Sequence, residues 1–269
     1  MTDGTEIAGD RPVFIFAASW RTGSTMLQRL LSASDELMIW GEPGFLEQAR
    51  GLYNRASNYL QKVEWNRKAL NEDRLQDHWI PVLSPASARC EVALKNFFDS
   101  LYQEESALIG KARWGFKEVR KNALENALFL KKIYPDAKFL VLVRDPFDTF
   151  RSLKGKRFHQ DLSEKYEAIR TWSQNVEDFH VRAVEENLDF RFVVLEKLVQ
   201  CNEDNPEYLQ ELTEFLGIEL TKTMIDVLGN KKDSSGNSVE LTAEEISEVS
   251  DITRQQRAYF EYPVPDSTS

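Results

Sequence analysis

A short polar loop holds the residues of this chain that are best suited to chemistry. The apolar run Val13–Ala18 is followed closely by Arg21-Thr22-Gly23-Ser24-Thr25, and Leu27, Leu30 and Leu31 then recur at helical spacing. A strand, a loop with one glycine and a helix direct backbone N–H groups and the positive end of a helix dipole to one point, which suits a phosphate or a sulfate. Arg21 adds a positive charge there. The alternative is an ordinary strand–turn–helix that binds nothing.

Arg144 and Ser152 form a second candidate anion site. Arg144 follows the apolar run Lys138–Val143, Asp145 suits a helix N-cap and Pro146 suits the first helical position. Ser152 then lies about two helical turns beyond the cap, so that Arg144 and Ser152 can reach one anion. The competing interpretation is an ion pair between Arg144 and Asp145, with Ser152 an incidental residue of the helix.

Charged residues follow the other expected strands as well. Glu42 comes after the second strand, Lys117-Glu118 ends the third, and Glu196 follows the fifth. Ligands of open parallel sheets bind outside the carboxyl ends of the strands. We therefore expect a cleft lined by both cations and carboxylates. For Glu118, a structural ion pair with Lys117 or Arg120 is the simpler expectation.

Alternating strand and helix patterns must position these residues, and they predict an α/β fold with a largely parallel sheet. Strands are expected at Val13–Ala18, Leu37–Trp40, Arg113–Lys117, Lys138–Val143 and Phe190–Leu195. Helices are expected at Ser24–Ser34, Phe45–Val63, Ala86–Glu105, Asn122–Tyr134, Pro146–Gly155, Ser163–Asn187, Pro206–Leu216 and Thr242–Phe260. The last helix opens with a capping-box pattern, Thr242-Ala243-Glu244-Glu245.

Composition limits the classes of function. The 269 residues fit one domain, expected to span 1–269, and the net charge of −10 argues against a nucleic-acid partner. Two distant cysteines and three scattered histidines predict neither a disulfide framework nor a metal site. No apolar run reaches transmembrane length, and the first residues lack the pattern of a signal peptide. A cytoplasmic protein is expected, although a trimmed lumenal domain fits equally well. The oligomeric state is left open.

The two anion motifs together resemble those of sulfotransferases that use 3′-phosphoadenosine 5′-phosphosulfate. In that family the loop that binds the 5′-phosphosulfate follows the first strand, and Arg21-Thr22-Gly23-Ser24-Thr25 is similar to it. The family's 3′-phosphate motif is an arginine at a strand end with a serine eight residues later, as Arg144 and Ser152 are here. An arginine at the start of the first loop looks more like the bacterial and membrane-type branches than the cytosolic branch.

The resemblance implies a P-loop-like three-layer α/β sandwich with a central, mainly parallel sheet flanked by helices. It also implies sulfuryl transfer from this donor to a hydroxyl of a carbohydrate or a small polar molecule, without a metal. Residues 45–106 would form a helical insertion on the acceptor side. Donor-binding residues would be Arg21, Thr22, Gly23, Ser24, Thr25, Arg144, Ser152 and, in a C-terminal loop, Lys231, Lys232 and Ser235.

The resemblance further implies three catalytic residues. Arg21 would neutralise charge on the leaving phosphate, and Glu42 would act as the general base. Lys117 is included because Trp114-Gly115-Phe116-Lys117-Glu118 resembles a family motif in which a lysine follows Gly-X. Glu42 could instead be a residue that begins a helix beside Pro43, in which case His78 or His159 would be the base. Leu195 stands where a similar family segment has an aromatic residue.

Two other functions remain as alternatives. A nucleotide kinase or hydrolase would use a phosphate-binding loop, but that loop has a lysine directly before the Ser or Thr. Gly23 precedes Ser24 here. A non-catalytic nucleotide-binding relative of the same fold is the third class.

Overall fold

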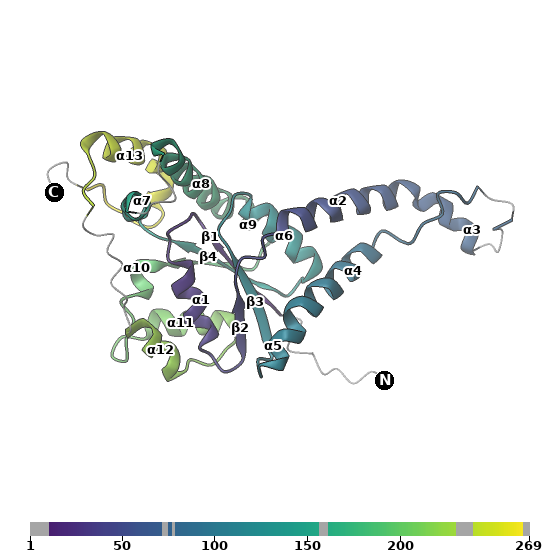
Figure 1. The fold of residues 1–269 in the computed structure, drawn as a ribbon, viewed down its shortest axis with the longest axis horizontal. Helices are drawn as coiled ribbons and strands as arrows, with labels where there is room; N and C mark the ends of the chain where they lie inside the picture. Colours follow the sequence, from purple (N-terminus) through teal and green to yellow (C-terminus); the bar gives the residue numbers. More distant parts are fainter. Residues whose placement is uncertain (1–10, 72–74, 77–78, 156–160, 230–238, 266–269) are drawn as a thin grey trace.

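Five parallel strands form the centre of the protein, in the order β2-β3-β1-β4-β5 (Figure 1). The computed structural model describes residues 11–71, 75–76, 79–155, 161–229 and 239–265. The strands are β1 (Val13–Ala17), β2 (Leu37–Trp40), β3 (Arg113–Glu118), β4 (Lys138–Val143) and β5 (Phe190–Val194). All five predicted strands are present, and each end lies within one residue of the expected position.

Helices connect the strands and cover the sheet. They are α1 (Ser24–Ser32), α2 (Leu46–Val63), α3 (Lys68–Asn71), α4 (Arg89–Phe98), α5 (Glu104–Leu108), α6 (Ala123–Ile133), α7 (Pro146–Lys154), α8 (Leu162–His180), α9 (Arg182–Glu185), α10 (Leu195–Leu198), α11 (Glu207–Leu216), α12 (Lys222–Gly229) and α13 (Ala243–Ala258). A 3-10 turn, η2 (Glu64–Arg67), and a π-helical turn, η3 (Asp99–Gln103), complete them.

The helix predictions are wrong in several places. The helix expected at Ala86–Glu105 begins later and is divided into α4, η3 and α5, since the π-helical turn interrupts the regular hydrogen bonding. The helix expected at Ser163–Asn187 is divided into α8 and α9 at Val181. The helices α3, α10 and α12 were not expected.

Side chains alternate between the two faces of the sheet, which makes three layers. Phe14 and Phe16 of β1 belong to an aromatic-rich core together with residues of α2, α6 and α8. Val13 and Ile15 point to the opposite face, where they pack with leucines of α1 and α11 and with α12. These side chains are buried, so strands such as β1 are covered on both faces. The predicted three-layer α/β sandwich is confirmed.

Two long helices leave the sandwich and extend well beyond it. Figure 1 shows α2 leading away from the sheet, α3 near the tip and α4 returning toward the sheet. We call the segment from Leu46 to Phe98 the arm. Its base is anchored because Leu46, Ala49 and Tyr53 of α2 and Phe98 of α4 are buried in the aromatic-rich core. Helices α2, α3, α4 and α5 lie within residues 45–106, while the helical insertion on the acceptor side stays a prediction.

In the described part of the chain, no helix is both long and apolar enough to cross a bilayer. The same residues contain no group of three or more His, Cys, Asp or Glu side chains arranged to hold a metal ion.

Candidate anion-binding and catalytic site

The loops that follow β1 and β4 meet at the carboxyl edge of the sheet. β1 pairs with β4 on one side and with β3 on the other. The chain after β1 leads toward β2, whereas the chain after β4 leads to β5, so the direction of winding changes between these two strands. This is the topological switch point at which open α/β sheets bind ligands.

The β1–α1 loop is held in an unusual backbone conformation. Arg21 has φ of 68° and Gly23 has φ of 91°, both in the left-handed region that favours glycine. Gly23 is the N-cap of α1, and no side chain caps this helix. The first N–H groups of a helix have no partner within the helix. In α1, Met26 N already donates to the Gly23 carbonyl oxygen at 2.9 Å, so the N–H groups of Ser24 and Thr25 are the ones that an external acceptor would take.

Internal hydrogen bonds and packing support the loop. Thr22 is completely buried, and its hydroxyl donates to the Ser19 carbonyl oxygen at 2.9 Å. Ser19 in turn donates from its hydroxyl to Ala168 O of α8 at 2.8 Å. A methyl group on Gly23 would stand 2.8 Å from Leu195 Cδ1. Thr22 thus contributes its side chain to the loop's structure, and Leu195 fixes how close the loop lies to β5.

The two predicted anion motifs are joined directly. Arg21 Nε donates to Ser152 Oγ at 3.1 Å, across 131 residues of sequence. Arg144 Nη1 donates to the Arg21 carbonyl oxygen at 3.1 Å. Trp172 Nε1 donates to the Arg144 carbonyl oxygen at 3.1 Å, which holds the end of β4 against α8. Arg21, Arg144 and Ser152 therefore form one cluster rather than two separate sites.

This cluster has a marked excess of positive charge. No Asp or Glu among the described residues forms an ion pair with Arg21 or Arg144. Partial burial lowers the pKa of the Arg21 guanidinium, and the positive charge of Arg144 lowers it further. Two adjacent cations beside an uncapped helix N-terminus favour binding of an anion with several charged oxygens.

Asp145 does not act as a counter-ion for Arg144. As predicted, it is the N-cap of α7: its Oδ1 accepts from Phe147 N at 2.7 Å and from Asp148 N at 3.2 Å. Its own backbone N–H donates to Glu196 Oε1 at 2.9 Å. Burial raises the pKa of Asp145 to about 6. The alternative Arg144–Asp145 ion pair is absent, and the acid instead fixes the start of the helix that carries Ser152.

Glu196 connects this region to the C-terminal part of the chain. Its Oε2 accepts a hydrogen bond from the Tyr262 hydroxyl at 2.9 Å. Burial raises the pKa of that hydroxyl, and the negative charge of Glu196 raises it further. Neither Tyr262 nor Trp172 was predicted as part of the site. Each contributes through contacts between segments distant in sequence, so no local motif marks them.

Glu42 and Lys117 form a second cluster at the same sheet edge. Lys117 Nζ lies 2.8 Å from Glu42 Oε1, and the Lys117 side chain is 9% exposed while that of Glu42 is 34% exposed. Arg120 Nη2 lies 4.0 Å from Glu42 Oε2. Lys117 pairs with Ile15 of β1 in the sheet register, which places this cluster beside the strand that leads into the Arg21 loop. Glu42 thus combines access to solvent with a nearby cation.

Glu118 has a structural role. It is buried, its Oε2 lies 3.3 Å from Arg120 Nη1, and its Oε1 accepts from Val119 N at 2.8 Å. Burial raises the pKa of this carboxyl. The expected ion pair of Glu118 is therefore formed with Arg120, while Lys117 pairs with Glu42. The remaining predicted positions, Lys231, Lys232, Ser235, His78 and His159, lie outside the described residues.

Comparisons with known proteins show the family and the fold of this chain. The family model described as "Sulfotransferase family" matches residues 12–222. The sulfotransferase domain of the Synechococcus PCC 7002 olefin synthase is similar in fold, with a TM-score of 0.57, 18% identity and coverage of 96% of this chain and 97% of that one. The sulfotransferase domain of the curacin biosynthetic pathway is similar too, with a TM-score of 0.53 and 15% identity. The comparison covers 95% of this chain and 99% of that one. Comparison with curated proteins found no match.

Proposed function

The chain belongs to the sulfotransferase family, and we propose that it transfers a sulfuryl group from 3′-phosphoadenosine 5′-phosphosulfate to the hydroxyl of a small-molecule acceptor. The observation that carries this proposal is the cluster in which Arg21 donates to Ser152 and Arg144 donates to Arg21. It joins the β1–α1 loop to the β4–α7 segment. A donor with phosphates at both its 5′ and 3′ positions offers anionic groups for both parts.

The residues of the first loop act on the 5′-phosphosulfate. Backbone N–H groups at the start of α1, from Thr22 to Thr25, and the Arg21 guanidinium donate hydrogen bonds to it. As the S–O bond to the 5′-phosphate breaks, negative charge develops on the bridging oxygen, and Arg21 stabilises it. Arginine remains protonated, so it acts as a fixed hydrogen-bonding charge and transfers no proton.

Arg144 and Ser152 bind the 3′-phosphate. Ser152 is almost fully buried and already accepts from Arg21, so its hydroxyl proton is free to be donated to a phosphate oxygen. The cap formed by Asp145 and the bond from Trp172 to the Arg144 carbonyl hold both residues in place. Lys231, Lys232 and Ser235 belong to the same proposal as residues that close over the donor, on the resemblance alone.

Glu42 removes the proton of the acceptor hydroxyl. As that oxygen forms its bond to sulfur, the proton passes to a Glu42 carboxylate oxygen and the nucleotide leaves as 3′-phosphoadenosine 5′-phosphate. Lys117 orients Glu42 through their ion pair. It becomes free to stabilise the sulfuryl oxygens when Glu42 is neutralised.

The test is transfer of radiolabelled sulfate from the donor to a panel of hydroxyl compounds, with and without a metal chelator. The proposal predicts labelled product that is formed equally well in the chelator. Nucleoside-triphosphate chemistry that stops on chelation would support the kinase or hydrolase instead. Donor binding without transfer to any member of the panel would support the non-catalytic relative.

A further inference from the structure

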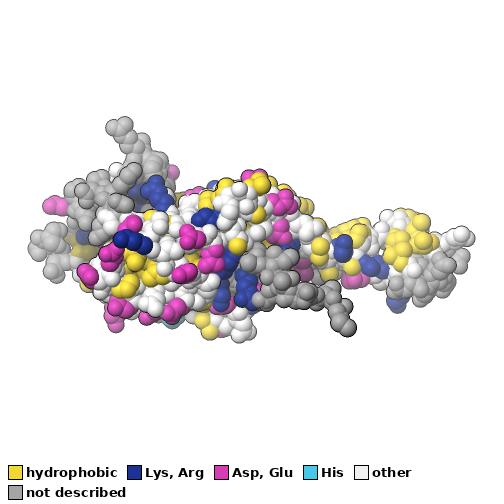
Figure 2. Space-filling model, turned by 90° about the horizontal axis from the view of Figure 1, so that it is seen from below, with side chains coloured by type: hydrophobic (Ala, Val, Ile, Leu, Met, Phe, Trp, Pro, Cys, Tyr) yellow, Lys and Arg dark blue, Asp and Glu magenta, His cyan; other side chains and the backbone are white. Residues whose placement is uncertain are grey.

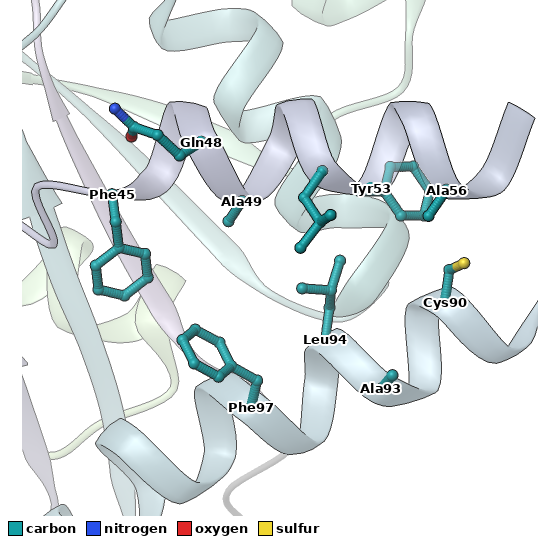
Figure 3. A pocket seen from close by; sticks show the side chains of 10 residues that line it. Phe45, Gln48, Ala49, Tyr53, Ala56, Cys90, Ala93, Leu94 and Phe97 are labelled. Atoms are coloured by element: carbon teal, nitrogen blue, oxygen red, sulfur yellow. The ribbon is translucent and has the colours of Figure 1, made fainter.

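A large apolar cavity lies between α2 and α4, at the base of the arm (Figure 3). Its volume is about 520 Å³, within the range of roughly 300–1,000 Å³ that small-molecule sites occupy. Of its ten lining residues, only Gln48 carries an amide or a charge, and the others are aliphatic, aromatic or the thiol of Cys90. Leu52 and Phe97 line it and remain 55% and 46% exposed, so the cavity is open to solvent.

One end of the cavity lies close in the chain to Glu42, the proposed base. Phe45 lines that end, is the N-cap of α2 and follows Glu42 by three residues. The Phe45 ring centroid lies 5.7 Å from that of Phe97 and 6.1 Å from that of Phe98. The Phe98 ring in turn lies 6.4 Å from that of Phe116 in β3, so the cavity is anchored on the aromatic-rich face of the sheet. The cavity therefore begins three residues beyond the proposed base and extends from there along the arm.

The opposite end lies farther along the arm. Figure 3 shows Phe45 and Phe97 together at one end, Leu94 facing α2 in the middle, and Ala56 and Cys90 at the other end. The same arrangement fits the sequence, because α2 and α4 run in opposite directions and each presents apolar residues at helical spacing to the other. A ligand that fills the cavity would thus be elongated, with one end at Phe45.

We propose that this cavity holds the apolar portion of the acceptor, so that the substrate is an amphiphilic alcohol with its hydroxyl at Glu42 and its alkyl or aryl chain between α2 and α4. The proposal rests on the function proposed above and names its substrate class. A carbohydrate in the cavity would leave several hydroxyls without hydrogen-bond partners, whereas a hydrocarbon chain gains by leaving water. It therefore replaces the carbohydrate or small polar acceptor that the sequence predicts.

The first experiment measures kcat/KM for a series of primary alcohols, 1-butanol to 1-octanol, with methyl glucoside as the polar comparison. If each added methylene enters the cavity, kcat/KM rises by about fourfold per methylene, which is the transfer free energy of ~0.8 kcal/mol converted at 25 °C. A flat series, or methyl glucoside exceeding 1-octanol, would overturn the proposal.

Ala93→Trp fills the cavity from α4, and Ala107→Trp is the matched control. Ala93 lines the cavity, whereas Ala107 is exposed on α5 outside it. Ala93→Trp should lower kcat/KM for 1-octanol by at least about tenfold, the gain from roughly two methylenes, and leave 1-butanol nearly unchanged. Ala107→Trp should change neither. Equal losses for both alcohols in Ala93→Trp would contradict a chain-binding role.

A second measurement needs neither turnover nor a variant. Cys90 lines the cavity and is partly exposed, whereas Cys201 is buried and serves as an internal reference. In the wild-type protein with bound 3′-phosphoadenosine 5′-phosphate, 1-octanol should slow alkylation of Cys90 by N-ethylmaleimide, and methyl glucoside should not. The contrary result is a protein that elutes as a dimer and whose Cys90 does not react even without alcohol. A second copy would then cover the cavity, and the proposal would be wrong.

These outcomes separate the two proposals. If the protein does not bind the nucleotide, or transfers sulfate to no alcohol or sugar, the proposed function itself is wrong. Normal nucleotide binding and transfer, without dependence on chain length and without protection of Cys90, removes only the amphiphilic acceptor.

Discussion

Arg144 and Arg21 are neighbouring cations that we assign to different phosphates of one donor. Arg144→Ala should weaken binding of 3′-phosphoadenosine 5′-phosphate by roughly 2–4 kcal/mol, because charge-assisted hydrogen bonds contribute ~1.5–3 kcal/mol each. Adenosine 5′-phosphosulfate, which lacks the 3′-phosphate, should lose much less affinity. Titration calorimetry of both ligands gives the comparison, with Arg191→Ala on β5, outside the cluster, as control. Equal losses for the two ligands would mean that Arg144 does not bind the 3′-phosphate.

Glu42 is assigned as the base because it combines partial exposure with a cation, Lys117, at 2.8 Å. Glu42→Gln should leave nucleotide affinity near that of the wild type and lower turnover at least ~10²-fold, since the amide keeps the shape and removes the basic oxygen. Glu47→Gln, an exposed acid in the first turn of α2, is the control and should keep its turnover. If Glu42→Gln lowers only the melting temperature, Glu42 is structural and the base role passes to His78 or His159.

Asp145 gives the stability of the protein a specific dependence on pH. Its pKa is raised to about 6 by burial, above the ordinary value of 3.8, so the folded state holds this proton more tightly than the unfolded state. The protonated carboxyl therefore adds to the free energy of unfolding in full below about pH 4. This stabilisation is lost as the pH rises to about 6 and the folded protein releases the proton.

Asp145→Asn tests this assignment. Asparagine also serves as an N-cap but does not ionise. The variant should gain stability relative to the wild type between pH 4 and 7, by up to ~3 kcal/mol at 1.36 kcal/mol per pKa unit. Urea unfolding of both proteins across this range measures the difference. A difference that stays constant with pH would refute the raised pKa.

Among the elements, the β1–α1 loop depends most on a single backbone conformation. Gly23→Ala places a side chain at φ of 91° and 2.8 Å from Leu195 Cδ1. It should destabilise the fold by about 1–3 kcal/mol, through strain and overpacking, and weaken nucleotide binding at least about tenfold because the loop must move. Gly110→Ala is the control, because its φ is a similar 79° but no atom lies within 4 Å of the added methyl group.

The control should therefore lose some stability and keep its nucleotide affinity. Chemical unfolding and calorimetry on the same preparations provide both quantities. Unchanged affinity in Gly23→Ala would show that the conformation of this loop does not determine donor binding.

The elements that could be predicted are those whose signals are local. β1 and β4 are continuous apolar runs because helices cover both faces of the sheet, and the Asp145 cap and the Thr242 capping box appear where their residues predict them. The helix α10 has only four residues, too few for a periodic pattern to emerge. The π-helical turn at Asp99–Gln103 likewise has no local signal that distinguishes it from α-helix.

That polar residues gather at this sheet edge could be predicted from the sequence, but their contacts could not. Arg21, Arg144 and Ser152 were expected at an anion site, yet the hydrogen bond from Arg21 to Ser152 depends on how β1 and α7 pack. The apolar cavity was missed for the same reason. The mixed composition of residues 45–106 suggests a polar surface, and only the pairing of α2 with α4 shows that their apolar faces enclose a space.

At the scale of the whole molecule, charges of both signs are spread over the surface, and the arm adds exposed apolar side chains such as Leu52 and Trp65. Figure 2 shows acidic and basic side chains interspersed over the sandwich on the face it presents, and both hydrophobic and basic side chains along the arm at the right. With a net charge of −10, the protein lacks the overall positive charge that attracts polyanions in general. Recognition of an anionic donor must therefore be local, at the Arg21–Arg144 cluster.

Titration calorimetry of the wild-type protein with 3′-phosphoadenosine 5′-phosphate, with adenosine 5′-phosphate as the comparison, tests this account most directly. The account predicts one site per chain, tighter binding of the ligand that has both phosphates, and a raised melting temperature. A hundredfold excess over the dissociation constant should add about 2.7 kcal/mol to the free energy of unfolding. Absence of binding at millimolar nucleotide, or equal affinity for the two ligands, would contradict the assignment of the cluster as the donor site.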